Sequence, residues 1–216
     1  MAMLIAMSNA EFWNDKFHHD AAASQSIFAG EPNPIIADLL ERIYPDHSAG
    51  SAPNAAAPRA LDLGSGRGRH TVWLAKQGWE TTALDFSDVG LAHTARALAA
   101  EQLDAHLLQA DLNEWEPTPE SFDAIVAAFI HLPSVDQRKL WEKVARALAP
   151  GGHLIVVAHH PENQIHGPQN PDLLYDAESV VSAFGAGFSA VVAERRITKE
   201  DGDRQAIDTI VLLRKA

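Results

Sequence analysis

The stretch Leu61-Asp62-Leu63-Gly64-Ser65-Gly66-Arg67-Gly68-Arg69-His70 decides the fold of this chain. An apolar strand runs into three glycines at alternate positions, and a helical pattern begins at the third of them. Glycine permits positive φ and lets a ligand approach the backbone, while the first turn of the following helix offers free N–H groups. In open α/β sheets, ligands bind at such junctions, outside the carboxyl ends of the strands. We therefore predict a ligand-binding glycine turn after the first strand.

The rest of the chain alternates between strand and helix patterns. Strands are expected at 59–63, 80–84, 106–110, 122–129 and 153–158, and helices at 68–77, 88–100, 135–149 and 177–184. This alternation builds a parallel sheet with helices on both faces. Two long runs then follow, 188–198 and 205–214, and Asp201-Gly202-Asp203 joins them as a hairpin turn. The expected fold is a doubly wound, mostly parallel seven-stranded α/β sheet of the Rossmann-like kind, with an antiparallel C-terminal hairpin.

Three segments precede the first strand. Residues 1–34 are rich in aromatic side chains, which are rarely left in water, so we expect an N-terminal arm that packs on the main domain. Asn33-Pro34 predicts a helix start, with Asn33 as the N-cap, and the helix should end near Tyr44-Pro45. Residues 46–58 consist mainly of small residues and proline and predict a flexible connector. The main domain is expected to span 35–216.

Composition limits the partners. The chain has 17 basic and 29 acidic residues, a net charge of −12, and no run of lysines or arginines, which disfavours a nucleic-acid partner. The absence of cysteine excludes disulfides, thiolate nucleophiles and cysteine-bound zinc. The apolar N-terminus has no basic flank and no segment reaches about 18 apolar residues, so we expect a cytoplasmic protein without a membrane partner. Monomer and homodimer both fit.

Two ligand classes use such a glycine turn. A dinucleotide requires a glycine where this chain has Arg69, and Asp62 would repel its pyrophosphate. A Walker loop is excluded because no Gly-Lys-Ser/Thr follows. S-adenosylmethionine has an ammonium, a sulfonium, a ribose diol and an adenine but no phosphate, so an acidic residue beside the turn suits it. A tight turn that binds nothing is the remaining alternative.

Two more acids end the next strands. Asp85 follows the second strand, where its carboxylate can accept both ribose hydroxyls, and Asp111 follows the third, where it can accept the adenine amino group. Either acid alone could be an ordinary helix-start residue. One acid at the tip of each of three successive strands, with the glycine turn at the first, favours S-adenosylmethionine as cofactor.

These motifs resemble those of class I S-adenosylmethionine-dependent methyltransferases. Residues 62–68 are similar to the glycine signature of that family, and Arg146-Ala147-Leu148-Ala149-Pro150-Gly151-Gly152-His153-Leu154 resembles its entry to the fifth strand. The antiparallel C-terminal pair fits the same family. The resemblance covers the chain from about residue 58 to the C-terminus and implies methyl transfer.

A narrower resemblance is to the thiopurine and tellurite-resistance methyltransferases. It rests on Trp13 and on residues 30–33, 68–75, 128–132 and 172–175. It implies that the arm folds over the cofactor, with Trp13 and Phe28 in this lid, and that the acceptor is a soft sulfur, selenium or tellurium nucleophile. Phe28-Ala29-Gly30 departs from the Tyr-Gly pair usual in that branch. The full set of predicted cofactor-binding residues is Trp13, Asp62, Gly64, Ser65, Gly66, Gly68, Asp85, Phe86, Asp111, Leu112 and Ala128.

Histidines and arginines supply candidates for the acceptor side. His131, just past the fourth strand, is the candidate catalytic residue, because a base helps when the acceptor is a hydroxyl or amine, although it can instead bond loop backbone. His159, His160 and His166 have no metal-ligand spacing, so no metal is expected, and their role stays open. Arg67, Arg69 and His70 can reach an anionic group or face solvent.

Three functions remain. The first is a methyltransferase acting on a small molecule, the second a non-catalytic module that binds S-adenosylmethionine, and the third a nicotinamide oxidoreductase, which Arg69 and Asp62 disfavour.

Overall fold

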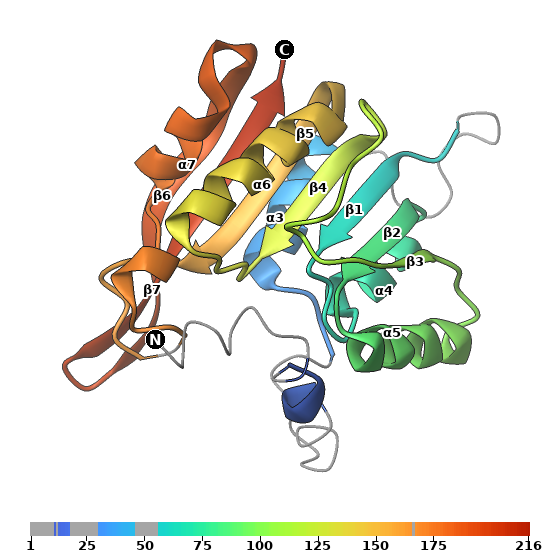
Figure 1. The fold of residues 1–216 in the computed structure, drawn as a ribbon, viewed down its shortest axis with the longest axis horizontal. Helices are drawn as coiled ribbons and strands as arrows, with labels where there is room; N and C mark the ends of the chain where they lie inside the picture. The colour runs from blue at the N-terminus through green and yellow to red at the C-terminus, as the bar shows by residue number, and fades with distance from the viewer. Residues whose placement is uncertain (1–10, 12, 18–29, 46–55, 166) are drawn as a thin grey trace. The chain divides into compact units, whose positions relative to one another are not determined.

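The computed structural model describes residues 11, 13–17, 30–45, 56–165 and 167–216. The chain forms two compact units, Met1–Trp115 and Glu116–Ala216, and each is described by itself (Figure 1). Phe28, His166, most of the predicted arm 1–34 and most of the predicted connector 46–58 lie outside the described residues, so the predicted domain boundaries stay predictions.

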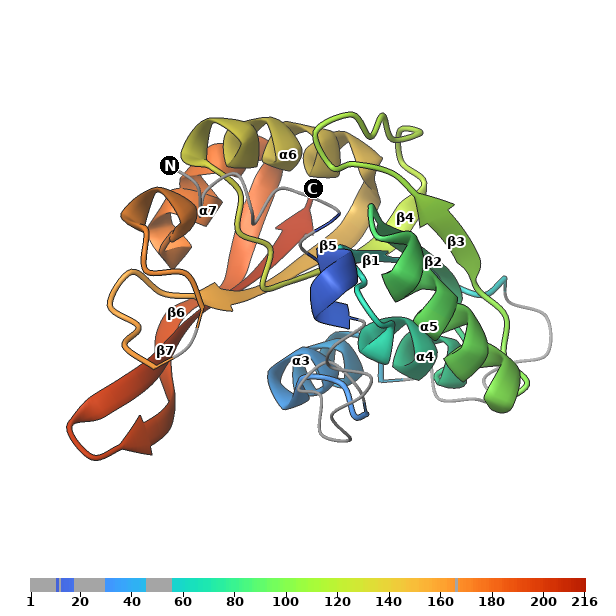
Figure 2. The ribbon, with the colours of Figure 1, turned by 60° about the horizontal axis from the view of Figure 1, so that its bottom comes forward.

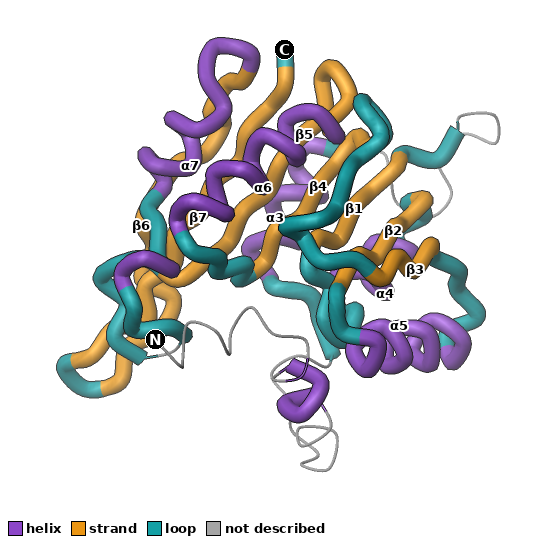
Figure 3. Tube along the Cα trace, in the orientation of Figure 1, coloured by secondary structure: helices purple, strands orange, loops and turns teal. Residues whose placement is uncertain are grey.

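The first unit is a three-stranded parallel sheet with helices. Its elements are α3 (Pro34–Ile43), β1 (Arg59–Leu63), α4 (Arg69–Lys76), β2 (Glu80–Asp85), α5 (Asp88–Ala100) and β3 (His106–Gln109). The strands lie in the order β3-β2-β1, with Leu63 opposite Leu84 and Asp85 opposite Gln109 (Figure 3). All three carboxyl ends therefore meet at one edge, where the glycine turn begins.

Local sequence explains the start of α3. The Asn33 side chain accepts a hydrogen bond from the N–H of Ile35, and Pro34 occupies the first helical position, as predicted. Ile36, Leu39 and Leu40 form its buried face. The helix is thus fixed by its cap and by one apolar stripe.

The second unit holds four strands and two longer helices. Its elements are β4 (Phe122–Ala128), α6 (Ser134–Ala147), β5 (Leu148–His159), η1 (Pro171–Leu173), α7 (Ala177–Phe184), η2 (Gly185–Gly187), β6 (Phe188–Asp201) and β7 (Arg204–Lys215). The strands follow the order β4-β5-β7-β6; β4 and β5 are parallel, and β7 is antiparallel to both of its neighbours. Helices α6 and α7 pack side by side on these strands (Figure 2).

The predicted fold class is confirmed. The sheet has seven strands, is mostly parallel and carries the antiparallel C-terminal hairpin, whose turn is Gly202-Asp203 between β6 and β7. Helices α5 and α7 have the predicted bounds. Among the residues that the structure describes, no helix is long and apolar enough to cross a membrane.

Most other bounds differ from the prediction by one to three residues, and the largest difference is at the start of β5. The helix expected to reach Ala149 ends at Ala147, and β5 begins at Leu148, five residues before the expected strand. Leu148 pairs with Phe122, and the N–H groups of Glu120 and Ser121 bond the carbonyls of Arg146 and Ala147. Strand pairing therefore ends the helix before Pro150-Gly151-Gly152 can.

Lys215 caps this helix end from β7. Its Nζ donates to the carbonyls of Ala145 at 2.9 Å and Leu148 at 2.7 Å. We expect Lys215→Met to lower the free energy of unfolding by about 1–3 kcal/mol, because two partly buried carbonyls lose their donor. Urea titration measures the change. Lys199→Met, on the exposed part of β6, is the matched control, and equal effects of the two variants would contradict the capping role.

Candidate functional site

The glycine turn depends on backbone conformations that favour glycine. The φ angles are 66° at Gly64, 56° at Gly66 and 82° at Gly68. The turn is anchored to β2, because the N–H of Ser65 donates to the Leu84 carbonyl at 2.9 Å. Three glycines in this motif are therefore required by its shape.

Asp85 holds the turn against the start of α5. Its Oδ2 accepts the N–H of Gly66 at 2.8 Å, and its Oδ1 accepts the N–H of Ser87 at 2.8 Å. Burial raises the pKa of Asp85, and these backbone hydrogen bonds partly oppose the rise. Each carboxylate oxygen can accept a second hydrogen bond, so the ribose role stays a prediction alongside this structural one.

Asp62 ties β1 to the first turn of α4. Its Oδ2 accepts the N–H of Thr71 at 2.9 Å and the Thr71 hydroxyl at 2.7 Å. The side chain is 1% exposed, and burial raises its pKa to about 6, opposed by the two Thr71 bonds. The contacts seen for Asp62 are internal, and its predicted role beside a ligand stays a prediction.

His70 links the glycine turn to the segment before α3. Its Nε2 accepts the N–H of Asn33 at 3.2 Å, and its Nδ1 lies 3.8 Å from Asp62 Oδ1. Burial lowers the pKa of His70 to about 3, with Arg69 adding to the decrease, so the ring is neutral. Arg67, Arg69 and His70 were predicted to reach an anionic group or face solvent. Of these three, His70 instead contacts Asn33 and Asp62 within the unit. No local pattern indicated that residues 30–33 and 68–70 are in contact.

Two polar side chains of the turn have no partner within the described structure. Ser65 is 7% exposed and its Oγ is buried without a hydrogen bond. Arg67, one residue beyond Gly66, likewise buries its Nε and Nη1 without an acceptor among the described residues. A buried donor without a partner costs about 1–3 kcal/mol. Unpartnered buried groups call for an explanation, and a bound ligand that supplies acceptors is one, so the binding role of the turn stays a prediction.

A short N-terminal helical turn, residues 13–17, lies on this site. The Phe17 ring packs so closely over the turn that a β-carbon on Gly66 would lie 3.4 Å from it. Asn14 donates to Asp88 at 2.9 Å and accepts from the Ser87 hydroxyl. Trp13 stands beside Phe17, with 5.6 Å between ring centroids. Of the two predicted lid residues, Trp13 lies in this helical turn and Phe28 is outside the described residues, and the lid role stays a prediction.

Sequence analysis missed two residues of α5 that pack on the turn. A β-carbon on Gly90 would lie 2.7 Å from the Gly66 carbonyl oxygen, and one on Gly68 would lie 2.5 Å from the Thr94 side chain. The available signal was Gly90 itself, because glycine inside a helix costs roughly 1 kcal/mol and calls for a packing reason.

The other predicted residues of this unit lie at the neighbouring strand tips. Phe86 follows β2, and its carbonyl accepts the Gln109 side-chain amide at 3.3 Å. Asp111 and Leu112 follow β3, and Asp111 Oδ1 accepts the N–H of Asn113 at 2.8 Å. All three predicted residues are partly exposed. Parallel pairing thus gathers them at the edge that carries the glycine turn.

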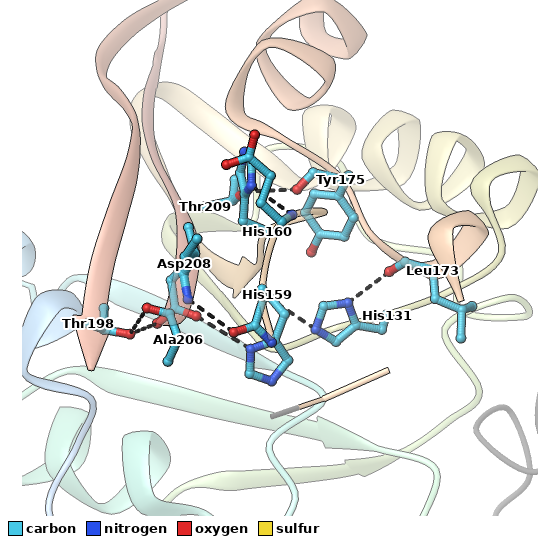
Figure 4. A network of polar contacts seen from close by, with 12 residues as sticks. His131, His159, His160, Leu173, Tyr175, Thr198, Ala206, Asp208 and Thr209 are labelled. Atoms are coloured by element: carbon cyan, nitrogen blue, oxygen red, sulfur yellow. Dashed lines mark hydrogen bonds and ion pairs between the residues drawn. The ribbon is translucent and has the colours of Figure 1, made fainter. Parts of the chain in front are cut away.

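The remaining predicted residues, Ala128 and His131, belong to the second unit. Ala128 ends β4, and the next residue, Phe129, has a φ of 57°, a conformation that bulky residues rarely adopt. His131 Nδ1 contacts the Leu173 carbonyl at 2.9 Å, and its Nε2 lies 3.5 Å from the N–H of His159 (Figure 4). Burial lowers the pKa of His131 to about 4.

The His131 ring stacks on His159, with 5.3 Å between centroids and an interplanar angle of 4°. His160 follows His159 and accepts the N–H of Glu162 at its Nδ1, 3.1 Å away. Across the described parts of the chain, no group of three or more His, Asp or Glu side chains could hold a metal ion. The second unit therefore contributes a pair of stacked histidines, His131 and His159.

Comparisons with known proteins find similarity to methyltransferases. Residues 60–152 match a family model described as a methyltransferase domain. A demethylmenaquinone methyltransferase of Thermus thermophilus is 33% identical over 108 residues, 49% of this chain and 49% of the relative. The chain spans about half the length of the curated relatives that it first matches.

Solved structures share the fold. TehB from Haemophilus influenzae has a TM-score of 0.66 at 17% identity, covering 86% of this chain and 63% of TehB. A 1,6-didemethyltoxoflavin-N1-methyltransferase from Burkholderia thailandensis, solved with its substrate and S-adenosylhomocysteine, has a TM-score of 0.65 at 16% identity, covering 94% of this chain and 87% of that one.

The buried carboxyl of Asp62 predicts a pH-dependent stability. Because its pKa is about 6 when folded and near 3.8 when unfolded, the unfolded chain releases this proton first as pH rises. The free energy of unfolding of the wild type, relative to Asp62→Asn, should therefore fall by up to about 3 kcal/mol between pH 4 and pH 6. Urea titrations across this range measure the difference. Parallel curves would contradict it.

Close packing at Gly90 predicts a second effect. In Gly90→Ala the new methyl group would collide with the Gly66 carbonyl oxygen, which no rotamer change can move. The free energy of unfolding should therefore fall by about 1–3 kcal/mol, and the turn should bind its ligand more weakly. Thermal unfolding measures the loss. Gly187→Ala, which meets no atom within 4 Å, is the control and should stay within about 0.5 kcal/mol of wild type. A Gly90→Ala variant as stable as this control would disprove the close approach.

Proposed function

We propose that this chain, a class I S-adenosylmethionine-dependent methyltransferase by its domain match and its fold, transfers a methyl group to a small molecule. The observation that carries the proposal is the glycine turn. It combines three positive-φ glycines, the unpartnered donors of Ser65 and Arg67, and the carboxylate of Asp85 at the next strand tip.

The residues of the turn fit S-adenosylmethionine by charge and by hydrogen bonding. Ser65 and Arg67 are donors without acceptors, which suits the carboxylate of the amino-acid end. Asp85 retains lone pairs for hydroxyl donors, and Asp111 stands at the next strand tip for an amino group. His70, which also lies at the end of this motif, is neutral and accepts the N–H of Asn33, so it offers no charge to a diphosphate.

When bound, the cofactor supplies a methyl carbon already activated by a sulfonium. The protein must orient an acceptor in line with that carbon and exclude water, and proximity of this kind can account for most of the acceleration. Phe17 and Trp13 are the aromatic residues that we assign to water exclusion over the turn.

The acceptor is proposed at two levels. The acidic composition favours a small-molecule acceptor over a nucleic acid. We also propose, as predicted from the sequence, that the protein is cytoplasmic and is a monomer or a homodimer. The sequence resemblance to the thiopurine and tellurite branch suggests a soft sulfur, selenium or tellurium nucleophile. The Thermus relative, by its name, methylates a demethylmenaquinone, which suggests a ring compound instead.

Calorimetry separates the proposed cofactor from the alternatives. We expect S-adenosylhomocysteine to bind at micromolar concentration and NAD not to bind; the reverse would make the chain a nicotinamide protein. Incubation with methyl-labelled cofactor and a panel of thiols, selenite, phenols and amines then separates an enzyme from a binding module. Labelled product supports the enzyme, and no product over the whole panel supports the module.

Arg67 gives the sharpest variant. Arg67→Met keeps the aliphatic stem and removes the unpartnered guanidinium, so the dissociation constant for S-adenosylhomocysteine should rise about 10- to 150-fold, the scale of a charged hydrogen bond. Arg96→Met, on the exposed side of α5, is the matched control and should bind like the wild type. If both variants bind equally well, Arg67 has no part in holding the ligand.

A further inference from the structure

His70 bridges two segments of the first unit that lie far apart in the sequence. Its Nε2 accepts the N–H of Asn33, 3.2 Å away, and its Nδ1 lies 3.8 Å from Oδ1 of Asp62. Asn33 is the residue before α3, whereas Asp62 belongs to β1 and precedes the glycine turn. We propose that Asp62, His70 and Asn33 form a clasp, in which the tautomer of His70 transmits the protonation state of Asp62 to the backbone of Asn33. His70 is thus a positioning residue that holds residues 30–33 to α4 while Asp62 is ionised.

One tautomer of the His70 ring fits both of its neighbours. The Asn33 N–H can only donate, so Nε2 must keep its lone pair. In a neutral imidazole the proton is then on Nδ1, where it faces the negative charge of Asp62. At 3.8 Å this contact is electrostatic rather than a direct hydrogen bond. An ionised Asp62 therefore stabilises the tautomer that binds Asn33.

The two oxygens of Asp62 are not equivalent. Oδ2 accepts the Thr71 N–H at 2.9 Å and the Thr71 hydroxyl at 2.7 Å. The amide donor cannot turn away, so a proton taken up by the carboxyl is placed on Oδ1, the oxygen that faces His70. An O–H and an N–H would then point at each other between side chains that are 1% and 4% exposed. Two donors that confront each other in a buried place are unfavourable.

A change of tautomer removes this conflict. Nδ1 gives its proton to water and Nε2 takes one from water, so the ring stays neutral and Asp62 alone gains a proton. Nδ1 then accepts a hydrogen bond from the carboxylic acid. The new Nε2–H, however, faces the N–H of Asn33, and the hydrogen bond between them is lost. Protonation of Asp62 therefore releases the backbone of Asn33.

Burial decides which group of the clasp takes a proton first. It raises the pKa of Asp62 to about 6 and lowers the pKa of His70 to about 3. The other charged groups that act on this pair include Arg69 from α4 and Asp85 from β2. The positive charge of Arg69 opposes protonation of both members, and the negative charge of Asp85 favours protonation of Asp62. The carboxyl therefore titrates near pH 6 while the ring stays neutral.

A cationic ligand at the glycine turn should close the clasp. Here the inference rests on the proposed function, in which the turn after Asp62 holds S-adenosylmethionine, with its ammonium and sulfonium groups. Positive charge favours the ionised carboxylate, and by linkage the ionised carboxylate favours the ligand. Ligand binding and the attachment of residues 30–33 to α4 are therefore coupled.

The first test needs no ligand. ¹⁵N shifts of the His70 ring, assigned from its own backbone amide, should show Nδ1–H at about pH 8 and a change to Nε2–H with a midpoint near pH 6. In Asp62→Asn the side-chain oxygen still accepts from Thr71 and the NH₂ group faces His70, so the ring should be Nε2–H throughout. Asp111→Asn, at another strand tip, is the control and should titrate like the wild type. Nε2–H at about pH 8 in the wild type, no change of tautomer on acidification, or Nδ1–H in Asp62→Asn would overturn the proposal.

The second test follows the hydrogen bond at Asn33 by amide hydrogen exchange. Once Asp62 is protonated, the Asn33 amide should exchange about 3- to 10-fold faster relative to the Val72 amide, which donates to Gly68 within α4. The Val72 reference removes the effect of pH on the intrinsic exchange rate.

Two variants of His70 separate the tautomer from simple packing. His70→Gln, whose side-chain oxygen can replace Nε2, should keep the Asn33 amide protected above and below pH 6, and His70→Leu should leave it unprotected at both. A pH-dependent step at Asn33 that persists in His70→Gln would overturn the proposal. Where a variant does not fold, the wild type decides, because the ring and the Asn33 amide must change with one midpoint, and two different midpoints would overturn the clasp.

The third test adds the ligand to the wild type. With saturating S-adenosylmethionine the midpoint of the Asn33 change should fall by about one pH unit or more, and S-adenosylhomocysteine, which lacks the sulfonium charge, should lower it less. A midpoint that does not move with bound S-adenosylmethionine would overturn the coupling to the ligand. If neither compound binds, the proposed function is wrong, while the ring titration of the free protein still decides whether the clasp exists.

Discussion

The hydrogen bond from the Gly66 N–H to the Asp85 carboxylate is the constraint on which the first unit depends. It joins the glycine turn after β1 to the tip of β2, while the second oxygen of Asp85 holds the backbone at Ser87. The turn can then approach α5 so closely that Gly90 leaves no room for a side chain. Burying a carboxylate costs free energy unless its oxygens accept hydrogen bonds. The glycine turn, the tip of β2 and the start of α5 therefore form together. The same carboxylate is the one that we assign to the ribose, which couples the fold to ligand binding.

Much of this fold was predictable because its signals are local. Strand and helix periods, the Asn33-Pro34 cap and the Gly202 turn each act within a few residues, and the elements formed where they indicated. The end of α6 was not predictable, because it depends on Leu148 pairing with Phe122 and on Lys215 reaching its carbonyls from the far end of the chain. Long-range pairing of this kind leaves no trace in the local pattern.

The candidate site divides in the same way. The acids and glycines at the strand tips were recognised because strand direction alone brings them to one edge. The partner of His70 was not recognised, because Asn33 is 37 residues distant in sequence and this spacing carries no signal. His131 illustrates the limit: its position suggested a base, which stays a prediction, whereas its ring contacts to Leu173 and His159 leave no signal in the local sequence.

The short helical turn at residues 13–17 has a consequence for exchange kinetics. Its contacts include the Phe17 ring over two glycines and two side-chain hydrogen bonds of Asn14. Such an attachment can detach while the sheet stays intact, because local opening requires only the contacts of the segment that moves. The exchange rate of a ligand held by the glycine turn, as we propose, would then depend on Asn14, and this rate could change without any change at the strand tips.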